Sequence, residues 1–195
     1  MAIRVNPPMA LRHPAKILQD PELRDYFRDI QTILFQLATN LEQQNKYGSF
    51  YDTTTQTAAA TNTAYAITFN NTDLSAGVSL STPTSRITVD ADGVYNFQHS
   101  IQIINTAGGN HSIWIWFRKN GTDIPDSATE ITVQGNNTEQ FAAWNLFIPL
   151  VVNDYVELMW SVSDTAVQLL AVSASSPVPA VPSVILTVNY VGYEV

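Results

Sequence analysis

Two pairs of closely spaced carboxylates are the residues of this sequence best suited to catalysis. Asp90 and Asp92 lie two positions apart, and Asp123 and Asp126 lie three apart. Paired carboxylates can act as acid and base in glycoside hydrolysis, or as oxygen ligands for calcium. Asp also caps its own backbone in turns, and the loop at Asp92 lacks the later acidic ligand of an EF-hand. Turns are therefore the simpler interpretation, and a polysaccharide depolymerase is kept as a minor alternative.

Few other groups in the sequence could carry out chemistry. His99 lies among aromatic residues, where a hydrogen-bonded core histidine is expected more often than a catalytic one. His111 falls in a polar turn and His13 near the N-terminus, which leaves no histidine pair for a metal, and the chain has no cysteine. No phosphate-binding loop, nucleophile elbow or dinucleotide fingerprint occurs. We therefore predict no catalytic residue, no metal site, no cofactor and no enzymatic activity.

Charge is divided unevenly along the 195 residues. Residues 1–46 hold six Lys and Arg against five Asp and Glu, whereas residues 47–195 hold three against twelve, a net charge of −9. Nucleic-acid binding is excluded, because it needs clustered cations. The longest apolar runs fall far short of the roughly 18 residues of a membrane span, and no secretory signal is recognisable. We expect a chain made in a cytoplasm and not inserted into a membrane.

The first 19 residues contain three prolines, three cations and no acid. Proline at this density disfavours a helix or a central strand, so residues 1–19 are predicted to form an extended basic arm. A disordered terminus is the alternative, but the segment has more apolar residues than a solvated tail needs. We interpret it as a docking segment for another protein, with that role assigned to Ile3, Arg4, Val5, Met9, Leu11, Arg12 and Lys16.

A helix start follows at Asp20, where an N-cap aspartate precedes a proline and a glutamate. We predict an amphipathic helix over residues 20–46, with apolar residues spaced alternately four and three apart. This spacing is typical of a coiled coil, although a helix lying on its own domain is the alternative over fewer than three heptads. The predicted trimer seam consists of Leu23, Phe27, Ile30, Leu34, Leu37 and Leu41.

From residue 47 onward, short runs of β-branched and aromatic residues alternate with clusters of Asn, Gly, Asp and Ser. This pattern is typical of an antiparallel sandwich or barrel. About nine short strands with no helix between them predict a mainly β, two-sheet jelly roll over residues 47–195. The predicted strands are 64–69, 86–89, 93–104, 112–119, 130–133, 139–150, 155–163, 168–173 and 182–191.

Apolar side chains are distributed differently on two of these strands. Over residues 93–104 they alternate with polar ones, which predicts one core face and one wet face. The run Ile113–Phe117 is apolar on both faces, as are stretches near 144–148, so we expect a subunit interface in addition to the core. The residues assigned to the core or a trimer interface are Tyr95, Phe97, His99, Ile113, Trp114, Ile115, Trp116, Phe117, Trp144, Trp160 and Tyr190.

Four motifs in order resemble the globular head of complement component C-one-q and the related tumour necrosis factor superfamily. Gly93–Phe97 matches the family's Gly-x-Tyr-x-Phe, and residues 114–121 resemble its strand ending in a Lys-Asn-Gly-type turn. Residues 141–158 resemble a strand, a turn with Asn in place of the usual Gly, and a second strand, while residues 183–190 resemble the closing strand. The resemblance implies an antiparallel jelly-roll head that assembles as a compact homotrimer around aromatic faces.

The order of basic arm, short coiled coil and acidic head resembles the fibres and spikes of tailed bacteriophages. This resemblance implies a virion structural protein, made in the host cytoplasm and anchored through residues 1–19 to a capsid, portal or tail protein. The head would point outward and contact the host surface, with a host glycan as a candidate ligand; a capsid decoration or cement protein without a receptor is the alternative. The candidate receptor-facing residues are Gly108, Asn110, Asn136 and Asn137.

Overall fold

The computed structural model describes residues 20–43 and 46–193. Contacts divide the chain into two compact units, with the boundary between residues 44 and 45. The first unit contains the helix and the second contains all the strands. The predicted docking segment lies outside the described residues, together with the side chains assigned to it: Ile3, Arg4, Val5, Met9, Leu11, Arg12 and Lys16.

Helix α1, Pro21–Gln43, begins where the capping sequence predicts. The Asp20 carboxylate accepts hydrogen bonds from the backbone N–H groups of Glu22 (3.0 Å) and Leu23 (3.4 Å). These bonds satisfy two of the donors that a helix start leaves open, and the charge of Glu22 favours the helix dipole. The two residues after Gln43 lie outside the described part. No helix among the described residues is long and apolar enough to cross a membrane.

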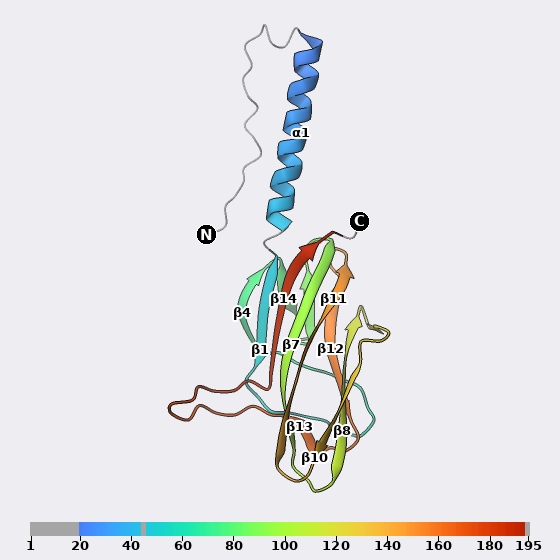
Figure 1. Ribbon diagram of the computed structural model, residues 1–195, viewed down its shortest axis with the longest axis vertical. Coiled ribbons are helices and arrows are strands. Elements are labelled where there is room, and N and C mark those ends of the chain that lie inside the picture. The colour runs from blue at the N-terminus through green and yellow to red at the C-terminus, as the bar shows by residue number, and fades with distance from the viewer. Residues whose placement is uncertain (1–19, 44–45, 194–195) are drawn as a thin grey trace. The chain divides into compact units, whose positions relative to one another are not determined.

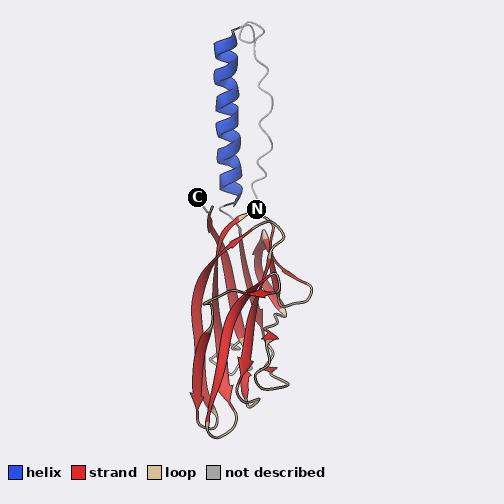
Figure 2. Ribbon diagram, turned by 90° about the vertical axis from the view of Figure 1, so that its right-hand side faces the viewer, coloured by secondary structure: helices blue, strands red, loops and turns tan. Residues whose placement is uncertain are grey.

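The second unit is an antiparallel sandwich of two sheets with seven strands each (Figures 1 and 2). Sheet A has the order β2-β13-β7-β14-β1-β4. Strand β11 pairs with the edge of β7 that lies opposite β14. Its strands are β1 Tyr47–Asp52, β2 Gln56–Thr57, β4 Asn71–Ala76, β7 Gly93–Asn105, β11 Thr138–Leu150, β13 Val167–Leu169 and β14 Val184–Gly192.

Sheet B has the order β10-β8-β12-β6-β5, with β3 paired to β12 and β9 paired to β8. Its strands are β3 Tyr65–Ala66, β5 Val78–Ser81, β6 Arg86–Val89, β8 Asn110–Lys119, β9 Thr122–Asp123, β10 Thr129–Gln134 and β12 Tyr155–Val162. The described part of the chain is therefore a mainly β antiparallel sandwich with one helix, as the sequence predicts.

Strand β7 shows how alternation in the sequence builds the core. Every second side chain from Tyr95 to Ile103 is buried, in the register that the sequence predicts. Phe97 meets Phe117 of sheet B edge to face, with 6.2 Å between the ring centroids. Burying each such side chain contributes about 1.5–3 kcal/mol, so contacts of this kind hold the two sheets together.

Five strands fall outside the predicted ranges, namely β1, β2, β4, β5 and β9. Strand β4 is at an edge of sheet A and is mostly exposed, so no apolar alternation marks it in the sequence. Strands β2 and β9 have only two residues each. Two predicted strands are longer than the observed ones by several residues, because 64–69 contains only β3 and 168–173 contains only the last two residues of β13. The rest of both segments is not strand, although the N–H groups of Ile67 and Leu170 still donate to carbonyls of β12 and β7.

Candidate functional site

The outer face of sheet A is broad and almost without charge. Strands β7, β11 and β14 together contain one Asp, Glu, Lys or Arg, which is Glu139 near the start of β11. Two aromatic side chains on this face, Phe141 and Phe147, are 70% and 57% exposed. Glu139 also points outward, near one end of this face beside Ile104. We call thirteen of the other outward side chains the uncharged face: Val94, Asn96, Gln98, Ser100, Gln102, Phe141, Ala143, Asn145, Phe147, Ile185, Thr187, Asn189 and Val191.

Polar side chains of the uncharged face bond to one another. The Asn145 amide donates to Oδ1 of Asn96 (2.8 Å), and the Asn96 amide donates to Oδ1 of Asn189 (3.3 Å), which links β11, β7 and β14. The Thr187 hydroxyl donates to the carbonyl of Gln98 (3.4 Å). Polar groups that already have protein partners lose less when water is removed. Another protein surface could therefore cover Asn96, Asn145, Asn189 and Thr187 at a reduced polar cost.

The outer face of sheet B carries charged pairs instead. Asp123 Oδ1 accepts hydrogen bonds from Arg118 Nε (2.7 Å) and Trp116 Nε1 (2.8 Å), and these bonds lower the pKa of Asp123. On the neighbouring strands, Arg86 Nε lies 3.6 Å from Glu157 Oε1. Removing water from charges is unfavourable, and charged residues are depleted at the centres of interfaces. This face is better suited to solvent than to a subunit contact.

The residues assigned to the core or a trimer interface fall into two groups. Those buried in the head are Tyr95, Phe97, His99, Ile113, Ile115, Phe117, Trp160 and Tyr190. Trp144 is partly buried and packs against the core, whereas Trp114 and Trp116 are partly buried on the other side of β8. The run Ile113–Phe117 therefore has one core face and one aromatic face, and the latter adjoins the charged pairs of sheet B.

His99 is buried in the core, yet neither ring nitrogen has a hydrogen-bond partner among the described residues. The expectation of a hydrogen-bonded core histidine is therefore wrong. The ring instead packs on aromatic side chains, with centroid distances of 4.1 Å to Trp144, its cross-strand neighbour, and 5.7 Å to Phe117. Burial lowers the pKa of His99 to about 4, so the ring is neutral at pH 7 and serves as an aromatic core residue.

The carboxylate pairs are engaged in contacts within the head. Asp90 Oδ1 lies 2.9 Å from Lys46 Nζ, and Asp92 accepts a hydrogen bond from the backbone N–H of Val152 (2.7 Å). Asp126 adopts the left-handed conformation of a turn residue, with a φ of 58°. In the part of the chain that the structure describes, no three His, Asp or Glu side chains are grouped to hold a metal ion. These contacts favour the turn interpretation of both pairs.

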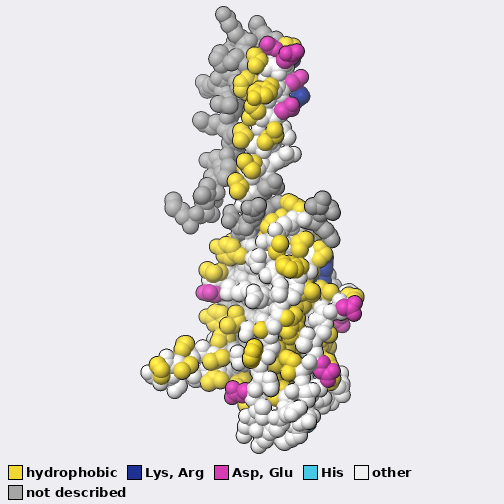
Figure 3. Space-filling view, viewed as in Figure 1, with side chains coloured by type: hydrophobic (Ala, Val, Ile, Leu, Met, Phe, Trp, Pro, Cys, Tyr) yellow, Lys and Arg dark blue, Asp and Glu magenta, His cyan; other side chains and the backbone are white. Residues whose placement is uncertain are grey.

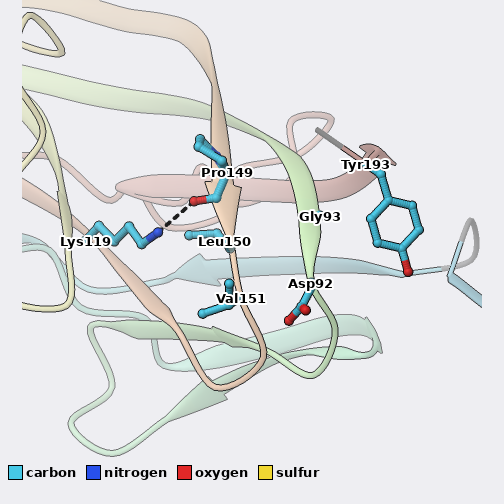
Figure 4. Close-up of a pocket in the computed structure, with 7 residues that line it drawn as sticks. All are labelled: Asp92, Gly93, Lys119, Pro149, Leu150, Val151 and Tyr193. Carbon is cyan, nitrogen blue, oxygen red and sulfur yellow. Dashed lines mark hydrogen bonds between the residues drawn. The ribbon is translucent and has the colours of Figure 1, made fainter. Parts of the chain in front are cut away.

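A pocket of about 390 Å³ lies where β7 begins and β11 ends (Figure 4). Lys119 Nζ donates to the carbonyl of Pro149 (2.8 Å) and forms an ion pair with Asp154 Oδ2 (2.9 Å). Burial raises the pKa of Asp154, but hydrogen bonds from the Val151 N–H, Asn120 and Lys119 outweigh it, and the net shift is downward. The cation is thus neutralised by the protein itself. The lining residues are Asp92, Gly93, Lys119, Pro149, Leu150, Val151 and Tyr193.

The candidate receptor-facing residues come together at the opposite end of the head. Gly108 and Asn110 lie at the β7–β8 turn, Asn136 and Asn137 lie at the β10–β11 turn, and all four are exposed. The two turns are neighbours, because β8 and β10 pair as far as Asn110 and Gln134. The structure therefore brings these four residues to one surface, which we call the end loops.

Asn105 connects the two turns, and no prediction from the sequence included it. Its buried amide donates to the carbonyls of Gly135 (2.9 Å) and Gly109 (3.3 Å), and its Oδ1 accepts from the N–H of Ala107 (3.1 Å). The sequence could have indicated this role, because Asn105 occupies a core position at the end of a strand with alternating apolar residues. A buried amide there needs hydrogen-bond partners from nearby backbone groups.

An apolar stripe runs along α1 and is visible in Figure 3. Of the predicted seam residues, Leu23, Leu34, Leu37 and Leu41 are 42–54% exposed, and Phe27 and Ile30 are partly exposed. Most stability of a protein helix comes from packing of its apolar face rather than from propensity alone. The stripe is therefore suited to association with other helices.

No protein-family model matches the sequence. No curated protein matches it either. The structure is nevertheless similar to solved structures, among them the globular domain of zebrafish complement 1qA protein, with a TM-score of 0.50 and 12% identity. The match covers 77% of this chain and 100% of that chain. At this identity the likeness establishes the fold, a jelly roll like that of C-one-q, which agrees with the motifs read from the sequence.

Proposed function

We propose that this chain is a non-enzymatic structural protein that functions as a homotrimer. The uncharged face carries the proposal, because a solitary head in water would expose Phe141, Phe147 and Ile185 side by side with neutral amides. Residues 47–195 have a net charge of −9, which disfavours association of copies, and the cost is lowest where the facing surfaces carry no charge. The uncharged face provides such a surface on every copy.

Two further features support association, and the first of them supports three copies in particular. The motifs shared with the heads of C-one-q and the tumour necrosis factor superfamily imply a three-fold assembly. In addition, the apolar stripe of α1 has heptad spacing, which is the pattern of helices that associate in parallel bundles. Association of the heads and association of the helices would then both contribute apolar burial to the trimer.

The biological role that we propose is a fibre or spike of a bacteriophage particle. Residues 1–19 would anchor the trimer to a capsid, portal or tail protein, and the head would face outward in the virion. The chain enters the head at Tyr47, beside the end of β14, while the end loops lie at the far ends of β7 and β8. An anchored stem would therefore present the end loops outward, where a host surface glycan is the candidate ligand.

The interface is tested by Phe147→Asp, which places a carboxylate on the uncharged face. Loss of the buried ring removes about 1.5–3 kcal/mol per protomer, and an unpaired buried charge adds several more, so the trimer should dissociate. Light scattering of the purified variant should then report monomers. The matched control is Thr132→Asp on the exposed side of β10 in sheet B, which should remain trimeric. A trimeric Phe147→Asp protein with an unchanged dissociation constant would place the interface elsewhere.

The anchoring role is tested by deleting residues 1–19. The shortened chain should still form trimers but should be absent from purified particles, as measured by mass spectrometry of their proteins. Incorporation at the normal level would contradict the docking role. Particles without the whole protein that adsorb normally to the host would favour the decoration-protein alternative.

A further inference from the structure

A long hairpin projects from the head between β13 and β14 (Figure 1). Its residues 171–182 contain no charged side chain, and residues 172–180 are all exposed. Val172 and Val178 are 45% and 55% exposed, and Figure 3 shows hydrophobic side chains along the projection. We call residues 171–182 the projecting hairpin. None of the predictions from the sequence assigns it a role.

The base of the projecting hairpin is fixed to sheet A. The N–H of Leu170 donates to the carbonyl of Gln102 on β7 (2.9 Å), and the N–H of Gln102 donates to the carbonyl of Ser183 (3.0 Å). Ser183 in turn donates to the carbonyl of Asp52 on β1 (2.9 Å). The position and direction in which the hairpin leaves the head are thus set by the sheet.

Beyond this base, little holds the hairpin itself together. Its two strands meet only at Val172–Val181 and Ser175–Val178, each pair joined by backbone hydrogen bonds of 2.7–3.0 Å. A two-stranded ribbon alone in water is marginally stable. Exposing the side chains of Val, Pro and Ala to water at successive positions is also unfavourable. We therefore expect the hairpin to pack on another surface.

We propose that the projecting hairpin packs on a second copy of this chain, so that each protomer holds its neighbour. The inference rests on the proposed homotrimer. The hairpin runs directly into β14, a strand of the uncharged face, and Ile185 on that face follows it by three residues. Contact with a neighbour through the uncharged face therefore brings the root of the hairpin to the edge of that contact.

Charge and symmetry favour a second copy over an unrelated partner. The hairpin has no charge with which to select an acidic or basic partner, and it matches the uncharged face in carrying no charge. In a closed three-fold ring every copy donates one hairpin and receives one, so each hairpin meets an identical surface. Such an exchange adds apolar burial to an assembly whose heads are each strongly acidic.

Cross-linking from the hairpin tests the proposal directly. The chain has no cysteine, so Val178→Cys provides a unique thiol for a benzophenone photo-cross-linker. Trimers mixed from ¹⁴N- and ¹⁵N-labelled chains should give cross-linked peptides that join a light chain to a heavy chain. Ala59→Cys, in the exposed loop between β2 and β3, is the matched control and should give at least tenfold fewer such links.

A shortened hairpin supplies the second measurement. Replacing residues 172–181 by Gly-Asn-Gly retains Leu170 and Ser183, so the head should fold, which circular dichroism can verify. Subunit exchange between light and heavy trimers, followed by native mass spectrometry, should become at least tenfold faster than in the full chain.

The outcomes separate this inference from the proposed function. Trimers that show no light-to-heavy links from position 178 and an unchanged exchange rate would overturn the hairpin contact and leave the trimer intact. Links from position 178 to a different protein of the particle, in place of this chain, would also overturn it. A full-length chain that is monomeric would overturn the trimer and the hairpin contact together.

Discussion

Asn105 and His99 are both polar residues at buried positions of β7, and their side chains differ in whether they form hydrogen bonds. Asn105 bonds to backbone groups of two turns and so fixes the end loops. His99 has no hydrogen bond and stays neutral between Trp144 and Phe117. The sequence marks both as polar residues in an apolar pattern, but it does not tell which one has partners, because those partners come from distant turns.

Lowering the pH should destabilise the head through His99. Its folded-state pKa of about 4 lies below the ordinary value of 6.5, so between these pH values the unfolded chain binds a proton that the folded chain excludes. The free energy of unfolding should therefore fall as the pH decreases from 6.5 to 4, by about 3 kcal/mol, with no further loss from this group below pH 4.

Urea denaturation followed by tryptophan fluorescence between pH 7.5 and 4 measures this effect. His99→Leu should remove that part of the pH dependence, whereas the control His111→Leu, outside the core, should retain it. A His99→Leu protein whose stability falls with pH as steeply as the parent's would refute the assignment.

At the scale of elements, local signals predict helix α1 and strand β7 well. The Asp20 cap sets the helix start, and strict alternation sets the core face of β7, because both depend on neighbours in the sequence. Strand β4 and the projecting hairpin are not predicted from the sequence, because local signals do not determine them. Their conformations depend on what lies beside them in space, and their sequences are neither periodic nor rich in core residues.

The uncharged face could not be predicted from the sequence either, because it depends on which strands are neighbours in space. The sequence points to Ile113–Phe117 and to a stretch near 144–148 as apolar on both faces. Only the second lies in the broad neutral surface, which extends across β11, β7 and β14. No short motif reveals that these three strands are neighbours. Their register also brings Asn145, Asn96 and Asn189 into one hydrogen-bonded row.

The stem is tested at this scale by Leu34→Asp. Leu34 is 52% exposed in the single chain, so the substitution should leave the fold of head and helix unchanged. In a trimer it places three like charges in the seam and should weaken subunit association by at least tenfold in sedimentation equilibrium. Gln36→Asp, exposed and outside the predicted seam, is the matched control. Equal dissociation constants for both variants would argue against a coiled-coil stem.

For the whole molecule, the main feature is that one sheet of the head carries charged pairs on its outer face and the other is almost without charge. The charged pairs Arg118–Asp123 and Arg86–Glu157 belong to sheet B, while sheet A presents the uncharged face and the root of the projecting hairpin. The net charge of −9 on residues 47–195 disfavours contact between copies, and it does so least at the uncharged face. This division is the physical basis for proposing that three chains form the functional unit.

The mass of the purified full-length chain in solution tests that claim most directly. Multi-angle light scattering at micromolar concentration and neutral pH should report about three times the single-chain mass of 21.5 kDa, independent of dilution. A stable particle of 21.5 kDa under the same conditions would contradict the homotrimer.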